Sequence, residues 1–261
     1  MAELGRWTAL LLAGQRPGGD PLARHFGEQW KALVSVGGEA MLSRVAKTLL
    51  ASPEIGRVVV LAQEPEALTA RADTAWLAQD PRVALLTSQA SISESVSVAA
   101  GSVAAPWPVL VTTADHPLLT PAMVAAFVAG TGDADVAVGM VERRVLLAAY
   151  PENQRTWLKL ADGAWSGANL FALASERSRA ALELWATVEA DRKKAWKLFA
   201  AFGPMLFARA LTRTIGMGTA LALAGRRLGF DARLVALPQA EAAIDVDKPS
   251  DHALAESILT S

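Results

Sequence analysis

The chain of 261 residues contains no cysteine, so it can form no disulfide and offers no thiolate to a metal ion or a covalent mechanism. Its three histidines, His25, His116 and His252, are too widely separated for a zinc-binding motif. No apolar run approaches the roughly 20 residues that a membrane-spanning helix requires. The first residues lack the basic region and apolar core of a signal peptide, so we expect a cytoplasmic protein.

The composition is typical of a well-filled α/β domain. Apolar residues make up 52% of the chain and the formal net charge is −1, so one domain over residues 1–261 can bury a large core. Apolar strand-like segments alternate with helical ones, which predicts a Rossmann-like α/β fold with a mostly parallel mixed sheet and helices on both faces. The expected strands are 7–12, 57–62, 83–86, 108–113, 134–139 and 144–149, and the expected helices are 40–50, 66–78, 93–104 and 121–129.

The first expected strand ends at a glycine-containing loop that could hold phosphate groups. Gly14, Gly18 and Gly19 would allow backbone N–H groups to approach a polyphosphate closely. Arg16 within the loop and Lys31 beyond it add the positive charge that a triphosphate needs. Because neither Gly-Lys-Ser/Thr nor Gly-x-Gly-x-x-Gly occurs here, the loop is neither a P-loop nor a dinucleotide-binding turn.

Acidic residues follow a later buried strand and recur near the C-terminus. Asp115 comes just after the apolar run 109–113, at the strand end where open α/β sheets bind ligands. Asp245 and Asp247 belong to the segment Ile244-Asp245-Val246-Asp247-Lys248-Pro249.

In this order, the three segments resemble those of the MobA-like nucleotidyltransferases, which include the molybdenum-cofactor guanylyl- and cytidylyltransferases. Members carry Leu-x-Ala-Gly-Gly-x-Gly-x-Arg-Met-Gly after the first strand, then a lysine and a Leu-x-x-Val segment, to which Lys31, Leu33 and Val36 correspond. The glycine loop departs from this pattern because Gln15 replaces a glycine and the spacer is longer. Either Arg16 or Arg24 could therefore take the place of the family arginine.

The resemblance implies a GT-A-like fold and a set of site residues. Arg16, Lys31 and Asp115 would be catalytic, and Asp115 together with Asp245 or Asp247 would hold Mg²⁺. Gly167 and Asn169, in a Gly-x-Asn-x-Phe pattern, would contact the acceptor, although such residues also serve as plain turn formers. The implied nucleotide-binding residues are Leu12, Ala13, Gly14, Gln15, Gly18, Gly19, Ser88 and Ser95. The alternative for the serines is that they only cap the helix that follows.

Residues 192–230 contain eight lysines and arginines and no acidic residue. Aromatic and aliphatic residues lie between these charges, which predicts a basic amphipathic helical insert at about 190–230, with Gly203-Pro204 separating two helices. The insert could contact a membrane surface, recruit an anionic substrate, pack as a subdomain or form a homodimer contact. Nucleic acid is not an expected partner, because the whole chain is slightly acidic and shows no recognition module.

The predicted reaction transfers a nucleoside monophosphate from CTP or GTP to a phosphorylated small-molecule or lipid-like acceptor and releases pyrophosphate. The protein would then be an Mg²⁺-dependent nucleotidyltransferase, cytoplasmic or peripheral at the inner membrane face. One alternative is a glycosyltransferase that binds a nucleotide-sugar and a metal through Asp133-Ala134-Asp135. The other is a non-catalytic nucleotide-binding protein.

Overall fold

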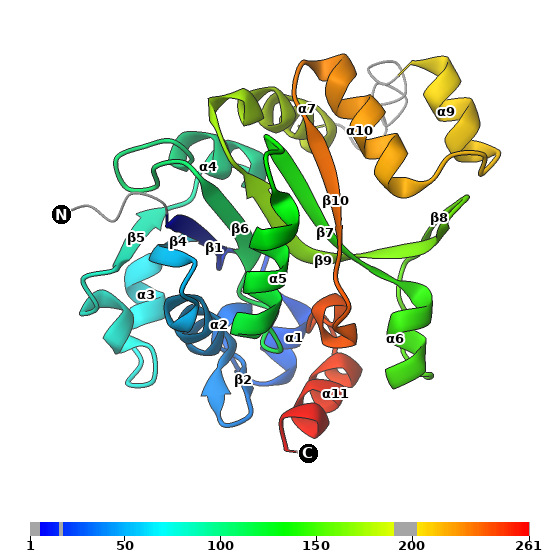
Figure 1. Ribbon diagram of the computed structural model, residues 1–261. Helices are drawn as coiled ribbons and strands as arrows, with labels where there is room; N and C mark the ends of the chain where they lie inside the picture. Colours follow the sequence, from blue (N-terminus) through cyan, green and yellow to red (C-terminus); the bar gives the residue numbers. More distant parts are fainter. Residues whose placement is uncertain (1–5, 16–17, 191–202, 261) are drawn as a thin grey trace.

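The computed structural model describes residues 6–15, 18–190 and 203–260, and a twisted central sheet dominates it (Figure 1). The strands of this sheet are β1 (Trp7–Leu12), β4 (Ile55–Ala62), β5 (Val83–Thr87), β6 (Val109–Thr113), β7 (Val136–Glu142), β8 (Leu158–Leu160), β9 (Gly163–Leu173) and β10 (Ala232–Ala236). They follow the order β10-β7-β9-β6-β1-β4-β5, with β8 paired to β9 beside this path. Only β9 runs antiparallel to its neighbours β6 and β7 along the path, so the mostly parallel mixed sheet is confirmed for the described residues.

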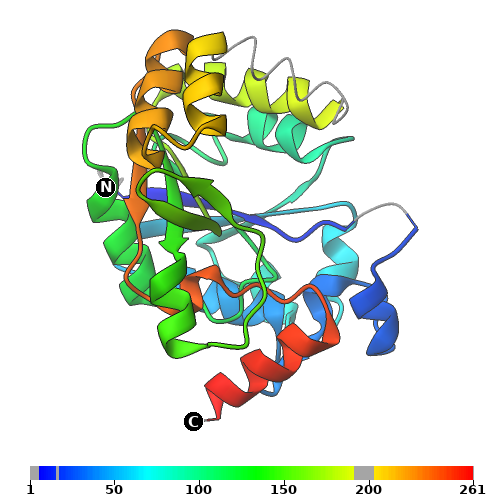
Figure 2. The same ribbon diagram turned by 90° about the vertical axis from the view of Figure 1, so that its right-hand side faces the viewer.

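Helices cover both faces of the sheet, as Figure 2 shows. On one side lie α1 (Pro21–His25), α2 (Met41–Ala51), α3 (Pro65–Thr69), α5 (Pro121–Thr131), α6 (Arg143–Ala149) and α11 (Pro249–Leu259). On the other lie α4 (Ile92–Ala99), α7 (Arg179–Ala190), α9 (Pro204–Leu211) and α10 (Met217–Leu228). Successive side chains of a strand point to opposite faces. Ala9 and Leu11 therefore pack into one hydrophobic core of the sheet, and Leu10 packs into a second core.

Three expected elements are corrected. Residues 144–149 form helix α6 and no strand, because the Glu142 carboxylate accepts a hydrogen bond from the Arg144 backbone and so caps a helix start. The expected helix 66–78 is interrupted after α3, where the Thr74 hydroxyl donates to the Leu68 carbonyl at 2.6 Å. The expected helix 93–104 ends at Ala99, because the chain turns at Gly101 with a φ of +80°.

The predicted basic insert is described in part. Arg192, Lys193, Lys194 and Lys197 lie outside the described residues, whereas α9 begins at Pro204, as expected from the sequence. All residues of α9 are described and none is buried, and the large apolar side chains of Met205 and Leu211 are exposed. No helix in the described parts of the chain is both long and apolar enough to cross a lipid bilayer.

Tyr150, the only tyrosine of the chain, follows α6, and its titration reports on its contact with Glu241. The Tyr150 hydroxyl donates to Glu241 Oε1 at 2.5 Å, and partial burial together with this carboxylate raises the pKa of Tyr150 to about 12. The unfolded chain should titrate near ~10. The contribution of this group to folding stability is therefore present below about pH 10 and lost as the pH rises through about 12.

We expect the phenolate absorbance of the folded protein to develop near pH 12, and that of the urea-unfolded chain about two pH units earlier. Glu241→Gln should shift the folded-state titration to lower pH. A folded protein whose phenolate forms near pH 10 would contradict the hydrogen bond.

Candidate active site

The loops that follow β1, β4 and β6 leave the sheet side by side at the carboxyl ends of these parallel strands. The Ala13 backbone N–H donates to Leu61 O and that of Ala114 donates to Leu12 O, each at 2.9 Å. The C-terminal acidic segment joins the same edge, because Val246 N donates to Asp115 O at 2.8 Å. The glycine loop and both acidic segments thus meet in one place, where open α/β sheets bind their ligands.

Lys31 lies between the two acidic segments of this candidate site. Its ammonium nitrogen is 2.5 Å from Asp115 Oδ2 and 2.5 Å from Asp247 Oδ1, so it bridges two predicted site residues from distant segments. The Lys31 side chain is only 12% exposed. Burial alone would lower the pKa of this amine, but the two carboxylates outweigh burial and raise its pKa above the usual value. Lys31 therefore stays protonated at neutral pH.

Gln15, which replaces a family glycine, fastens the glycine loop to Lys31. Its Oε1 accepts from the Lys31 backbone N–H at 3.2 Å, and its Nε2 donates to Gln29 O at 2.9 Å. Gln63, after β4, holds Gln15 from the other side by accepting from its N–H at 3.1 Å and donating to its carbonyl at 3.0 Å. A Cβ at Gly14 would lie 3.0 Å from the Gln63 amide, so a larger residue there would have to displace this side chain from Gln15. No motif in the sequence predicts a role for Gln63.

The remainder of the loop also depends on glycine. Gly18 and Gly19 have φ angles of +89° and +82°, which side-chain-bearing residues rarely adopt. Arg16 lies outside the described residues, whereas Arg24 donates from Nη1 to Gly18 O at 3.0 Å. Asp20 caps α1 by accepting from Leu22 N at 2.8 Å. Arg24 therefore contacts the loop through a backbone carbonyl, and the choice between the two arginines stays open.

Asp245 is held by Arg155 and Asn169. One of its oxygens forms an ion pair with Arg155 Nη1, and the other accepts from Asn169 Nδ2 at 3.0 Å. Burial opposes ionisation of Asp245, but Arg155 and Asn169 hold the pKa of its carboxyl below the ordinary value. No group of three His, Cys, Asp or Glu side chains in the described part of the chain is arranged for a metal ion. Between the two alternatives for the second carboxylate, Asp247 is the one beside Asp115.

The fit of a divalent cation is supported by one further observation on Asp115. Its Oδ1 atom is buried and has no hydrogen-bond partner among the described residues, so a second oxygen is available to a ligand. Asp115 and Asp247 are hard oxygen donors of the kind that Mg²⁺ prefers.

The predicted acceptor residues lie at the same edge. Because β9 is antiparallel, Asn169 and Gly167 lie beside the carboxyl ends of β6 and β7, where Gly167 pairs with Met140. A Cβ at Gly167 would meet no atom within 4 Å, so the space beside it is open. Asn169 adopts a φ of +50°, which asparagine tolerates better than most residues.

The two predicted serines differ in their surroundings. The Ser95 hydroxyl donates to Ser91 O at 2.6 Å and accepts from Gln89 N at 2.8 Å, so it is satisfied locally. Ser91 caps α4, as the alternative reading of these serines expected. Ser88 follows β5, and its hydroxyl is buried with no hydrogen-bond partner in the described structure, so it remains available to a ligand.

His116 is buried next to Asp115 and is 1% exposed. Burial lowers the pKa of its imidazole below the ordinary value, so the ring is neutral at neutral pH. A neutral ring at this depth helps to shape the floor of the site beneath Asp115.

The Asp133-Ala134-Asp135 segment lies at the wrong end of the sheet for a nucleotide-sugar site. It precedes β7, which runs parallel to β6, so it lies at the amino ends of these strands. Asp135 accepts hydrogen bonds from Ser175 Oγ at 3.0 Å and Asp231 N at 2.9 Å. These contacts make Asp135 a structural residue.

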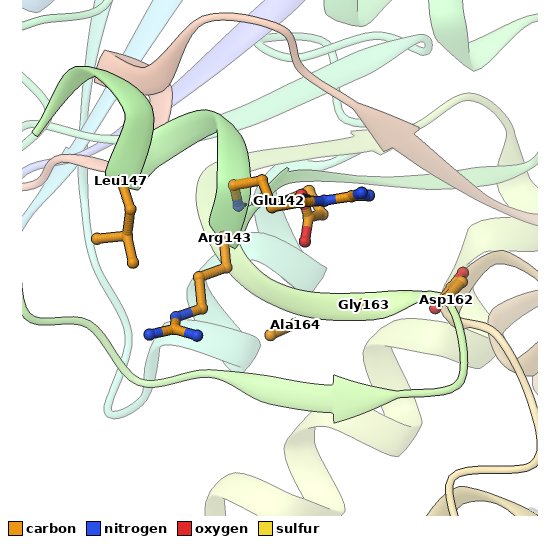
Figure 3. Close-up of a pocket in the computed structure, with 7 residues that line it drawn as sticks. Glu142, Arg143, Leu147, Asp162, Gly163 and Ala164 are labelled. Atoms are coloured by element: carbon orange, nitrogen blue, oxygen red, sulfur yellow. Dashed lines mark hydrogen bonds and ion pairs between the residues drawn. The ribbon is translucent and has the colours of Figure 1, made fainter. Parts of the chain in front are cut away.

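A separate pocket of about 500 Å³ opens between α6 and the β8–β9 hairpin. Figure 3 shows Arg143 and Leu147 projecting from α6 into the same space. Its lining residues are Glu142, Arg143, Arg144, Leu147, Asp162, Gly163 and Ala164. None of the sequence-predicted site residues is among them.

A mostly parallel α/β sheet with a glycine loop after β1 and a carboxylate after β6 defines the class of nucleotide-binding α/β proteins. The sequence model of the MobA-like NTP transferase domain matches residues 9–206. The chain therefore belongs to the MobA-like NTP transferase family, as the sequence resemblance predicted.

Solved structures share this fold. A hypothetical transferase from Thermus thermophilus is 28% identical, with a TM-score of 0.77 over 95% of this chain and 99% of that one. The 4-diphosphocytidyl-2C-methyl-D-erythritol synthase of Anaerococcus prevotii is 10% identical, with a TM-score of 0.57 over 98% of this chain and 100% of that one. A CMP:2-keto-3-deoxy-manno-octonic acid synthetase solved with CTP is 15% identical, with a TM-score of 0.59 over 98% of both chains. No curated protein matches the chain at a significant level.

Proposed function

We propose that this protein transfers a nucleoside monophosphate from CTP or GTP to a phosphorylated acceptor and releases pyrophosphate. The observation that carries the proposal is the Lys31 ammonium between Asp115 and Asp247, beside the glycine loop. A cation and two carboxylates at this edge can bind phosphate groups directly and through a divalent metal. Membership of the MobA-like NTP transferase family supports the same reaction class.

In this reaction, an oxygen of the acceptor phosphate attacks the α-phosphorus of the NTP. The new P–O bond forms as the bond to the bridging α–β oxygen breaks, and the electron pair leaves with pyrophosphate. Because the attacking phosphate oxygen is already ionised at neutral pH, no general base is needed. Rate enhancement then comes from positioning and from neutralising negative charge. Lys31 supplies a permanent positive charge for this purpose, and the backbone of Ala13 and Gly14 borders the nucleotide.

We propose that Asp115 and Asp247 hold Mg²⁺, with Asp245 supporting the site from its position beside Asn169. When bound, the ion would neutralise phosphate charge and orient the nucleotide. Lys31 pairs with both carboxylates, and its ammonium would be available to the phosphate groups when the carboxylates hold the metal ion. Ser88 would contribute its free hydroxyl to the nucleotide.

The proposal is tested by nucleotide-dependent stabilisation and by product formation. With Mg²⁺ present, we expect the preferred NTP to stabilise the protein by about 2.7 kcal/mol at a hundredfold excess over its Kd, and the other three NTPs to stabilise it less. Pyrophosphate release should require both an NTP and a phosphorylated alcohol. Absence of stabilisation by all four NTPs, or transfer from a nucleotide-sugar alone, would refute the proposed reaction.

We also propose that the segment 192–230 contacts an anionic membrane surface, where a lipid-like acceptor could be presented. The support is its eight basic residues without an acid, together with the exposed Met205 and Leu211 of α9. Each basic residue near an anionic leaflet contributes about 1 kcal/mol. We expect salt-sensitive co-sedimentation with anionic but not neutral liposomes, reduced by Lys193→Glu/Lys194→Glu. Negligible pelleting under every condition would leave a packed subdomain or dimer contact as the role of the segment.

A further inference from the structure

A short segment, residues 151–157, links α6 to β8 and reaches the candidate site through the ion pair between Arg155 and Asp245. Tyr150 before it and Trp157 at its end pack against the main hydrophobic core, so both ends are anchored. Between them, Asn153 and Arg155 are partly buried, whereas the intervening residue 154 is exposed. The segment therefore presents alternate side chains to the protein interior.

Arg155 uses only one side of its guanidinium within the protein. Its Nη1 pairs with Asp245, while Nε and Nη2 are buried and have no hydrogen-bond partner among the residues that the structure describes. The side chain is 15% exposed. Buried donors are nearly always paired in native proteins, and leaving them unpaired is unfavourable. The two free donors therefore call for a partner that is not part of the described chain.

The free donors have the geometry of an anion-binding edge. The N–H groups of Nε and Nη2 point the same way on one edge of the planar guanidinium, whereas Nη1 faces another direction. Such an edge binds two oxygens of one carboxylate or phosphate group through parallel hydrogen bonds. Two residues earlier, Asn153 Oδ1 is also buried without a partner in the described structure, and it can accept from a ligand hydroxyl.

Arg155 is connected to the Asp115 centre through Asp245. Asp245, the partner of Arg155, also accepts from Asn169 Nδ2 at 3.0 Å. The next residue, Val246, donates to the Asp115 carbonyl at 2.8 Å. Arg155 thus borders the acceptor side of the Asp115 centre.

We infer that the Nε–Nη2 edge of Arg155 binds a carboxylate or phosphate group of the second substrate, with Asn153 accepting from a neighbouring hydroxyl. The assignment of this ligand as the acceptor rests on the proposed function. The ion pair with Asp245 fixes the guanidinium plane, so the free edge is held ready for the anion.

The test uses two small probes with the same three-carbon skeleton, glycerol 3-phosphate and glycerate, titrated by calorimetry into the full-length protein. We expect one of them to bind in the millimolar range, which decides between phosphate and carboxylate. Arg155→Lys keeps the charge beside Asp245 but removes the two-pronged edge, so its Kd for that probe should be at least tenfold weaker. Arg143→Lys, in the pocket of Figure 3, is the matched control and should bind as the wild type does.

Equal affinity in wild type and Arg155→Lys, a loss confined to Arg143→Lys, or no binding of either probe to the wild type would overturn the inference. Thermal denaturation of each variant checks that it is folded. The proposed function fails separately: it fails if no NTP stabilises the wild type, whatever the probes do. NTP affinity should be unchanged in Arg155→Lys, because the edge serves the second substrate.

Discussion

Replacing Asp115 by asparagine is expected to lower the rate of pyrophosphate release by about 10²–10³-fold, the range for losing one preorganised electrostatic group. Asparagine has nearly the same shape, but it is a poorer ligand for Mg²⁺ and no longer balances the charge of Lys31. The fold should be retained, because the contact that joins the two acidic segments uses the backbone carbonyl of Asp115. Steady-state pyrophosphate assays at varied Mg²⁺ concentration would measure the effect.

Asp133→Asn is the matched control for this experiment. Asp133 is an exposed acid at the opposite end of the sheet, so its substitution should leave both turnover and the Mg²⁺ requirement unchanged. Near-normal turnover in Asp115→Asn, with the melting temperature of the wild type, would exclude Asp115 as a metal ligand.

Replacing Lys31 by methionine should reduce both NTP affinity and turnover, and it should also destabilise the protein. Methionine keeps the length of the buried stem but leaves Asp115 and Asp247 facing each other without a cation. We expect the free energy of unfolding to fall by about 3 kcal/mol. This value is at the lower end of the range for breaking a buried ion pair, because Asp247, one of the two partners of Lys31, has a side chain that is 62% exposed. Added Mg²⁺ should recover part of this loss by taking the place of the ammonium between the two carboxylates.

Lys47→Met provides the control for stability. Lys47 pairs with Glu39 at the surface, where ion pairs contribute about 0–1 kcal/mol. Denaturant unfolding with and without Mg²⁺ separates the two variants. If Lys31→Met is as stable as Lys47→Met and gains nothing from Mg²⁺, Lys31 does not share its carboxylates with a metal.

The strands that the sequence predicts well are those buried on both faces. β1, β4 and β6 are mostly apolar and rich in Val and Leu, and they stand between clear turn signals, a pattern that leaves little ambiguity. Residues 144–149 are also apolar and short, and their length alone does not separate a strand from one buried helical turn. The deciding contact is the Glu142 cap, a local interaction that the periodicity of apolar residues does not register.

The candidate site shows a similar contrast between residues that a motif predicts and residues whose roles appear only in the folded chain. Lys31 and Asp115 stand in recognisable motifs, so the sequence predicts them, and the structure brings them together. Gln63 and Arg155 stand in no motif. Their roles depend on partners 48 and 90 residues away in sequence, Gln15 and Asp245, and only the folded chain brings these pairs into contact.

In the central sheet that the structure describes, β9 alone runs antiparallel to the other strands, and this has a consequence for how the protein can change. An antiparallel neighbour needs no crossover helix, so β7 and β9 are joined by an excursion, residues 143–162, that contains α6 and the short strand β8 and returns to the same end of the sheet. Lengthening or shortening that excursion would leave the register of the parallel strands intact, and with it the glycine loop and Asp115. On the proposed assignment of Arg155 to the second substrate, changes in the length of residues 143–162 would alter the acceptor half of the site without disturbing Lys31 and Asp115.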